Sequence, residues 1–167
     1  RGLGDVYKRQ PIYYQNKSTG RPTALKQTYK ASYIDASTEP AYPFGYGLSY
    51  TDFGYSDLKL LPGKAAGVHT EVSVKVTNTG KCAGEEVVQL YVQDKVASVT
   101  RPIKELKGFR KIHLNAGESK TVVFQITDDA LGFYDNEMNY MVEPGDFVFM
   151  VGGSSDDVQQ ITYNLEE

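Results

Sequence analysis

The sequence predicts an all-β protein built as a two-sheet antiparallel sandwich. From Phe53 onward, about seven or eight short segments alternate apolar with polar residues or run apolar, each bounded by Gly, Pro, Asn or Asp. No segment of helical length has a 3.6-residue period. This spacing of strands is typical of the immunoglobulin and fibronectin type III-like sandwiches. The absence of a Cys…Trp…Cys pattern argues against an antibody-type domain.

The first two clearly patterned strands lie on either side of the turn NTGK. In HTEVSVKVTNTGK, three valines alternate with polar residues, which is the period of a half-buried strand. The following segment EEVVQLYVQD also places apolar residues on one face. The inward residues of the two segments are predicted to be Val72, Val74, Val76, Val88, Leu90 and Val92. Gly80 can adopt the positive φ of a tight turn, so we expect these strands to pair as an antiparallel hairpin.

The remaining strands follow at similar spacing. The stretch ELKGFRKIHLNAGESKTVVFQI predicts two strands hinged at NAGES, with Val122, Phe124 and Ile126 on one face. The later segments LGFYD, NYMVE, GDFVFMVGG and VQQITYNL are each bounded by turn residues. Together they supply enough strands for two packed sheets.

The chain before the sandwich divides into two parts. Residues 1–10, RGLGDVYKRQ, are basic and show neither a strand nor a helix period, so we expect a non-native leader there. Residues 11–40 are polar and tyrosine-rich, with one short apolar stretch, PIYY. A segment of this composition cannot form a core alone. It is therefore predicted to be the tail of a larger unit.

Charge and composition exclude several classes of partner. The 18 Lys and Arg residues are interspersed with 21 Asp and Glu, so no basic cluster is present to bind nucleic acid. No apolar run approaches the roughly 18 residues of a membrane span. The single cysteine, Cys82, has no partner for an internal disulfide and no neighbouring ligands for zinc. We therefore expect no nucleic acid, membrane or metal partner.

No pattern of catalytic residues emerges from the sequence. The acidic pairs are Glu85–Glu86, Asp128–Asp129 and Asp156–Asp157. Neighbours on a strand point to opposite faces, and Asp in turns caps backbone N–H groups, so a structural role is favoured for each pair. His69 and His113 are isolated, and there is no nucleophile elbow or phosphate-binding loop. We predict no catalytic residue and no cofactor.

The 13 tyrosines keep one alternative open, because exposed aromatic rings can stack on sugars. A free-standing carbohydrate-binding or adhesion-type sandwich module is therefore a second hypothesis. Tryptophan is absent and the tyrosines are dispersed, which makes a dedicated sugar platform the weaker reading.

Several blocks of sequence, taken in order, resemble the C-terminal end of glycoside hydrolase family 3 enzymes of the bacterial periplasmic β-glucosidase type. The resemblance extends from Pro11 to about Leu165. The blocks are PIYYQNKSTGRP, YPFGYGLSYTDF, VTNTGKCAGEEVVQLYVQD, SVTRPIKELKGFRKIHLNAGESKTVVF, LGFYD and VEPGDFVFMVGGSS. Their order makes the resemblance more specific than any single block.

The resemblance implies a parent enzyme of three parts: a barrel with a nucleophilic Asp, an α/β sandwich domain with an acid/base Glu, and a fibronectin type III-like domain. Such a parent would hydrolyse β-linked gluco-oligosaccharides at their non-reducing ends with retention of configuration. Neither catalytic motif lies in the matched blocks, so this chain alone is expected to be inactive, and its substrate-binding residues are unknown. Its partners would be the upstream catalytic domains of the same chain, in the periplasm or secreted, with a homodimer left open.

The same resemblance sets the expected domain boundaries. Residues 11–40 would be the incomplete end of the α/β sandwich domain, 41–52 an inter-domain joint, and 53–167 the fibronectin type III-like domain. The joint, within AYPFGYGLSYTDF, is rich in aromatic residues and glycine, which can wedge between domains and turn tightly. Its predicted structural residues are Tyr42, Phe44, Gly45, Tyr46, Gly47 and Tyr50. We expect some of these rings to be unusually exposed.

Overall fold

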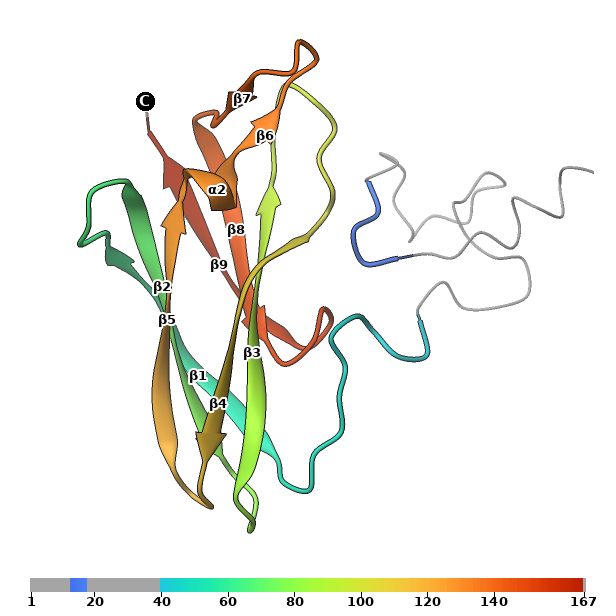
Figure 1. The fold of residues 1–167 in the computed structure, drawn as a ribbon, viewed down its shortest axis with the longest axis vertical. Coiled ribbons are helices and arrows are strands. Elements are labelled where there is room, and N and C mark those ends of the chain that lie inside the picture. Colours follow the sequence, from blue (N-terminus) through green and yellow to red (C-terminus); the bar gives the residue numbers. More distant parts are fainter. Residues whose placement is uncertain (1–12, 18–39, 167) are drawn as a thin grey trace, which may run out of the picture.

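The computed structural model describes residues 13–17 and 40–166, and it shows two β-sheets packed face to face (Figure 1). The three-stranded sheet has the order β1-β2-β5, formed by β1 (Phe53–Pro62), β2 (Val68–Asn78) and β5 (Ser119–Thr127). The four-stranded sheet has the order β4-β3-β8-β9, formed by β4 (Glu105–Leu114), β3 (Gly84–Asp94), β8 (Gly145–Gly152) and β9 (Val158–Leu165). Their pairings are antiparallel, which confirms the predicted sandwich.

A short excursion connects the two sheets between β5 and β8. It consists of the one-turn helix α2 (Asp128–Leu131) and a two-stranded ribbon of β6 (Phe133–Tyr134) and β7 (Tyr140–Met141). Within residues 13–17 and 40–166, no helix has the length and apolar character that crossing a bilayer requires. The predicted leader at 1–10 and almost all of the predicted tail at 11–40 lie outside the described residues.

The predicted hairpin between β2 and β3 is wrong. β2 pairs with β1 and β5, whereas β3 pairs with β4 and β8, so the turn at 79–83 carries the chain from one sheet to the other. The NAGES turn between β4 and β5 crosses between the sheets in the same way. Period-2 alternation identifies which residues face the core, but it carries no information on which strand is the hydrogen-bonded neighbour.

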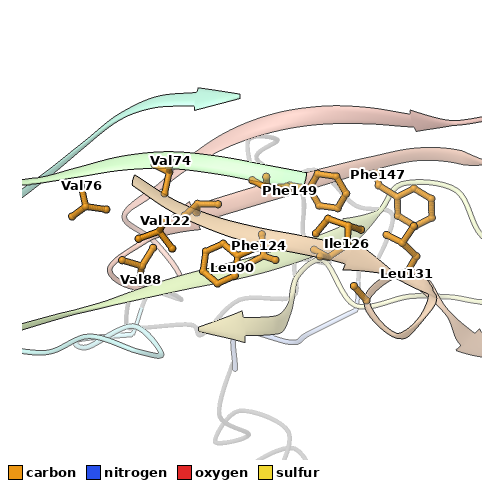
Figure 2. Close-up of a cluster of buried hydrophobic side chains, with 14 of the residues drawn as sticks. Val74, Val76, Val88, Leu90, Val122, Phe124, Ile126, Leu131, Phe147 and Phe149 are labelled. Carbon is orange, nitrogen blue, oxygen red and sulfur yellow. The ribbon is translucent and has the colours of Figure 1, made fainter. Parts of the chain in front are cut away.

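The core lies between the two sheets, where valines and aromatic rings from both interdigitate (Figure 2). Each inward residue predicted from the alternating pattern is at most 6% exposed. These residues are Val72, Val74, Val76, Val88, Leu90, Val92, Val122, Phe124 and Ile126. Phe147 and Phe149 from β8 and Leu131 from α2 complete the cluster. Burial of each large side chain contributes about 1.5–3 kcal/mol before entropy costs.

Asn78, fully buried at the end of β2, joins both sheet-crossing turns. Its amide nitrogen donates to the carbonyls of Cys82 (2.7 Å) and Leu114 (3.1 Å). Its amide oxygen accepts from the Gly80 N–H (3.1 Å) and from the hydroxyl of Thr51 (2.6 Å), which precedes β1. A single side chain therefore bonds polar groups of three segments that meet at this end of the sandwich.

We expect Asn78→Ala to lower the free energy of unfolding by about 2–4 kcal/mol, because buried donors and acceptors lose their partner. Chemical denaturation of the chain measures this value. The matched control is Asn164→Ala, which removes only an exposed side-chain bond to Asp146 at 2.8 Å and should change stability by no more than about 0.5 kcal/mol. Equal effects of the two substitutions would contradict the role given to Asn78.

Candidate functional site

The centre of the outer face of the four-stranded sheet is apolar, which is unusual for a sandwich. Tyr91 on β3 is completely buried, and Val148 and Met150 on β8 are 6% and 5% exposed, although all three point away from the main core. Tyr91 lies in register with Met150 on one side and with Leu106 of β4 on the other. The strands at the centre of this sheet are therefore buried on both faces.

Two segments that precede the sandwich cover part of this face. The ring of Tyr14 stacks on Phe44 with centroids 4.1 Å apart and meets Tyr91 edge to face at 5.9 Å. The N–H of Ser155, in the turn between β8 and β9, donates to the carbonyl of Phe44 at 2.8 Å. Lys104 also donates to the carbonyl of Ser155. Residues distant in sequence are thus brought together on one surface, at the right of the sandwich in Figure 1.

Gln89 anchors the predicted joint to the sheet. Its amide nitrogen donates to the carbonyls of Gly45 (3.1 Å) and Gly153 (2.6 Å), and its oxygen accepts from the Tyr91 hydroxyl. Gly45 has a φ of 80°, at the third position of a turn closed by the Tyr46 N–H and the Pro43 carbonyl at 3.0 Å. A Cβ on Gly45 would lie 2.0 Å from the Gln89 oxygen. Only glycine fits both the turn and this close approach.

The other predicted joint residues are largely exposed. Tyr50 is 101% exposed, Tyr42 74%, Tyr46 48% and Phe44 45%. Tyr42 and Tyr46 contact each other at 5.4 Å between centroids. Gly47 is not in the positive-φ region and has open space around its Cα, so the tight turn depends on Gly45 alone.

A cavity of about 620 Å³ lies between the covering segments and the loops that precede β4 and join β8 to β9. Its walls include Tyr13, Tyr14, Tyr42 and Phe44, with Lys104 and Asp156 at the polar side. Burial, followed by the negative charge of nearby groups, raises the pKa of Tyr91 to about 12. The Tyr91 hydroxyl therefore stays protonated at neutral pH and remains the donor to Gln89.

Comparison with known proteins places these features in a family. The model of the fibronectin type III-like domain matches residues 86–155. A periplasmic β-glucosidase of Salmonella typhimurium is 46% identical over 168 residues, which cover 99% of this chain and 21% of that protein. A putative β-xylosidase of Formosa agariphila is also 46% identical over 168 residues, covering 100% of this chain and 21% of that protein.

A solved structure agrees with these relatives. The β-glucosidase of Listeria innocua in complex with glucose superposes with a TM-score of 0.85 and 41% identity, over 94% of this chain and 22% of that one. The chain corresponds to the C-terminal part of glycoside hydrolase family 3 enzymes. It spans about a fifth of the length of these relatives and includes their fibronectin type III-like domain.

In this family member, the acidic residues have structural partners. Glu85 forms an ion pair with Lys111 at 2.6 Å, which lowers the pKa of Glu85, whereas Glu86 accepts from the Tyr55 hydroxyl at 2.6 Å on the other side of the strand. Burial, and then Glu86, raise the pKa of Tyr55. The predicted opposite orientation of the two glutamates is therefore confirmed.

The other charged candidates are also placed by the fold. Asp128 and Asp129 lie in the first turn of α2, and Asp128 contacts His69 at 2.6 Å. The backbone N–H groups of Asp156 and Asp157 both donate to the Ser154 hydroxyl. His113 is exposed. Within residues 13–17 and 40–166, no group of three His, Cys, Asp or Glu residues is arranged to hold a metal ion.

Sequence reasoning did not identify the outer apolar face, although a signal was present. The runs VVQLYV in β3 and FVFMV in β8 are continuously apolar or nearly so, unlike the alternating β2 and β5. Continuous runs of this kind indicate strands buried on both faces. The main-core residues of β3 were predicted, whereas Tyr91 and Gln89 between them were not.

We expect Gly45→Ala to detach the joint from the sheet, because the new Cβ collides with Gln89 and the φ is unfavourable. Amide hydrogen exchange of Ser155, whose N–H donates to Phe44, should accelerate about tenfold or more, equivalent to about 1–2 kcal/mol of local stability. Gly47→Ala is the matched control and should leave this exchange unchanged. Equal protection in both variants would refute the anchoring role of Gly45.

Proposed function

We propose that this chain is the non-catalytic C-terminal part of a retaining β-glucosidase-type glycoside hydrolase, and that its sandwich stabilises the parent enzyme. The observation that carries the proposal is the match to family 3 enzymes over nearly the whole chain, including the segments before the sandwich. The acidic residues described above are engaged in separate structural contacts, which supports a non-catalytic role.

The proposal includes the domain organisation and setting of the parent. Residues 11–40 end the preceding α/β sandwich domain, 41–52 form the joint, and 53–167 form the fibronectin type III-like domain. The parent acts on β-linked gluco-oligosaccharides or related xylosides, since the relatives include a β-glucosidase and a β-xylosidase. It is located in the periplasm or secreted, as the name of the Salmonella relative suggests.

The first test concerns catalysis. The purified chain should show no hydrolysis of an aryl β-glucoside or aryl β-xyloside, whereas the parent should hydrolyse at least one of them. Glu86→Gln in the parent should leave kcat unchanged, because Glu86 is held by the Tyr55 hydroxyl and not by substrate. Turnover by the chain alone, or loss of kcat in this variant with the fold intact, would overturn the non-catalytic assignment.

The second test concerns stability. Deleting residues 53–167 from the parent should lower its melting temperature and soluble yield, because apolar surface on the remaining part loses its cover. Thermal unfolding of the two proteins measures the difference. An unchanged melting temperature together with an unchanged rate would eliminate the stabilising role.

A further inference from the structure

The two outer faces of the sandwich differ in chemistry. On the three-stranded sheet, the outward residues of β2 are polar, and their neighbours on β1 and β5 are mostly polar, with Leu61 and Val123 as apolar exceptions. The polar residues are Glu71, Ser73, Lys75, Thr77, Lys59, Gln125, Thr121 and Ser119. The outer face of the four-stranded sheet instead carries the Tyr91 cluster. A sheet face that meets water is normally polar, so the second face, with its buried apolar cluster, has the composition of an interface.

Of the residues before the sandwich that the structure describes, 13–17 and 40–52, none covers the rest of this second face. Phe109 on β4 is 66% exposed although it lies in register with Gln89, the residue that anchors Gly45. Val87, two residues before Gln89, is 39% exposed and lines a cleft together with Tyr46 and Leu48 of the joint. Leu48 is 89% exposed. We call Tyr46, Leu48, Val87 and Phe109 the uncovered patch.

We propose that the uncovered patch binds the polypeptide that precedes this chain in the complete protein, and that the four-stranded sheet is the docking face. This inference rests on the proposed function and names the surface through which the sandwich would stabilise the parent. The patch continues the surface on which the Tyr14 ring contacts both Phe44 and Tyr91. The buried Tyr91 cluster and the uncovered patch therefore belong to one face of the sheet, and the described segments cover only part of that face.

The length and direction of the chain favour this occupant. The match covers 21% of the Salmonella relative, so most of that protein's length lies outside it. The segment at 13–17 lies on the docking face, which brings the preceding polypeptide to the patch at a high effective concentration. The Glu85–Lys111 ion pair lies beside Val87, as a polar rim around an apolar centre. A second copy of the chain has no such tether.

Thiol accessibility tests the inference without altering the core. Phe109→Cys is introduced on a Cys82→Ser background, in the isolated chain and in the parent, and the rate of alkylation is measured. We expect modification at least tenfold slower in the parent, because the preceding domain covers the position. Leu48→Cys should behave in the same way. Val96→Cys is the control, since Val96 is 75% exposed outside the patch, and its rate should be equal in both proteins.

Each outcome decides the question. Equal rates at Phe109→Cys in the chain and the parent would overturn docking at this face. If alkylation of Phe109→Cys in the isolated chain slows as the protein concentration rises, a second copy of the chain occupies the patch. The assignment to the preceding polypeptide would then be wrong. The measurement needs no substrate, so a parent without glycosidase activity would refute the proposed function while leaving the docking result readable. A parent that hydrolyses glycosides but whose Phe109→Cys thiol is alkylated as fast as in the isolated chain would refute only the docking face.

Discussion

The centre of the four-stranded sheet is buried on both faces, and much of the structure follows from this constraint. Residues of β3 alternate between Val88, Leu90 and Val92, which face the main core, and Gln89 and Tyr91, which face outward. An antiparallel sheet with two apolar faces cannot be stable with only one of them covered. The three-stranded sheet covers the inner face. The segments around Tyr14 and Phe44 are therefore required on the outer face, where a typical sandwich has only solvent.

Gln89 determines where that cover is attached. A buried amide is costly unless its hydrogen bonds are satisfied, and Gln89 is 5% exposed. The partners of Gln89 are the carbonyls of Gly45 and Gly153 and the hydroxyl of Tyr91. Because Gly45 is a glycine, the backbone can approach the amide closely. The polar residue in an apolar strand thus selects one position for the loop, which apolar contacts alone would not do.

The sequence was sufficient to predict the strands and the inner core, because period 2 is a local property that each strand carries by itself. The partner of each strand is not local. β2 and β3 both direct valines inward, and the same pattern arises from a hairpin in one sheet or from two strands facing each other across the core. In the structure, Asn78 stabilises the turns that cross from one sheet to the other. It therefore favours strands that face each other across the core over a hairpin within one sheet. An isolated Asn before Thr-Gly is also an ordinary turn signal, so its burial could not be inferred.

The joint and the sandwich are held together with different strengths. The sandwich has a continuous core of two sheets, whereas the loop from Phe44 to Tyr46 is fixed by the bonds from Ser155 and Gln89 and by one stacked ring. Segments with few buried contacts open at lower free energy than the core. The hydroxyl of Thr51 donates to the Asn78 side chain. Thr51 therefore marks the boundary between the weakly held loop and the stable sandwich. Covering Tyr46, Leu48, Val87 and Phe109 would therefore stabilise the loop more than the sandwich, and so couple the stable domain to whatever precedes it.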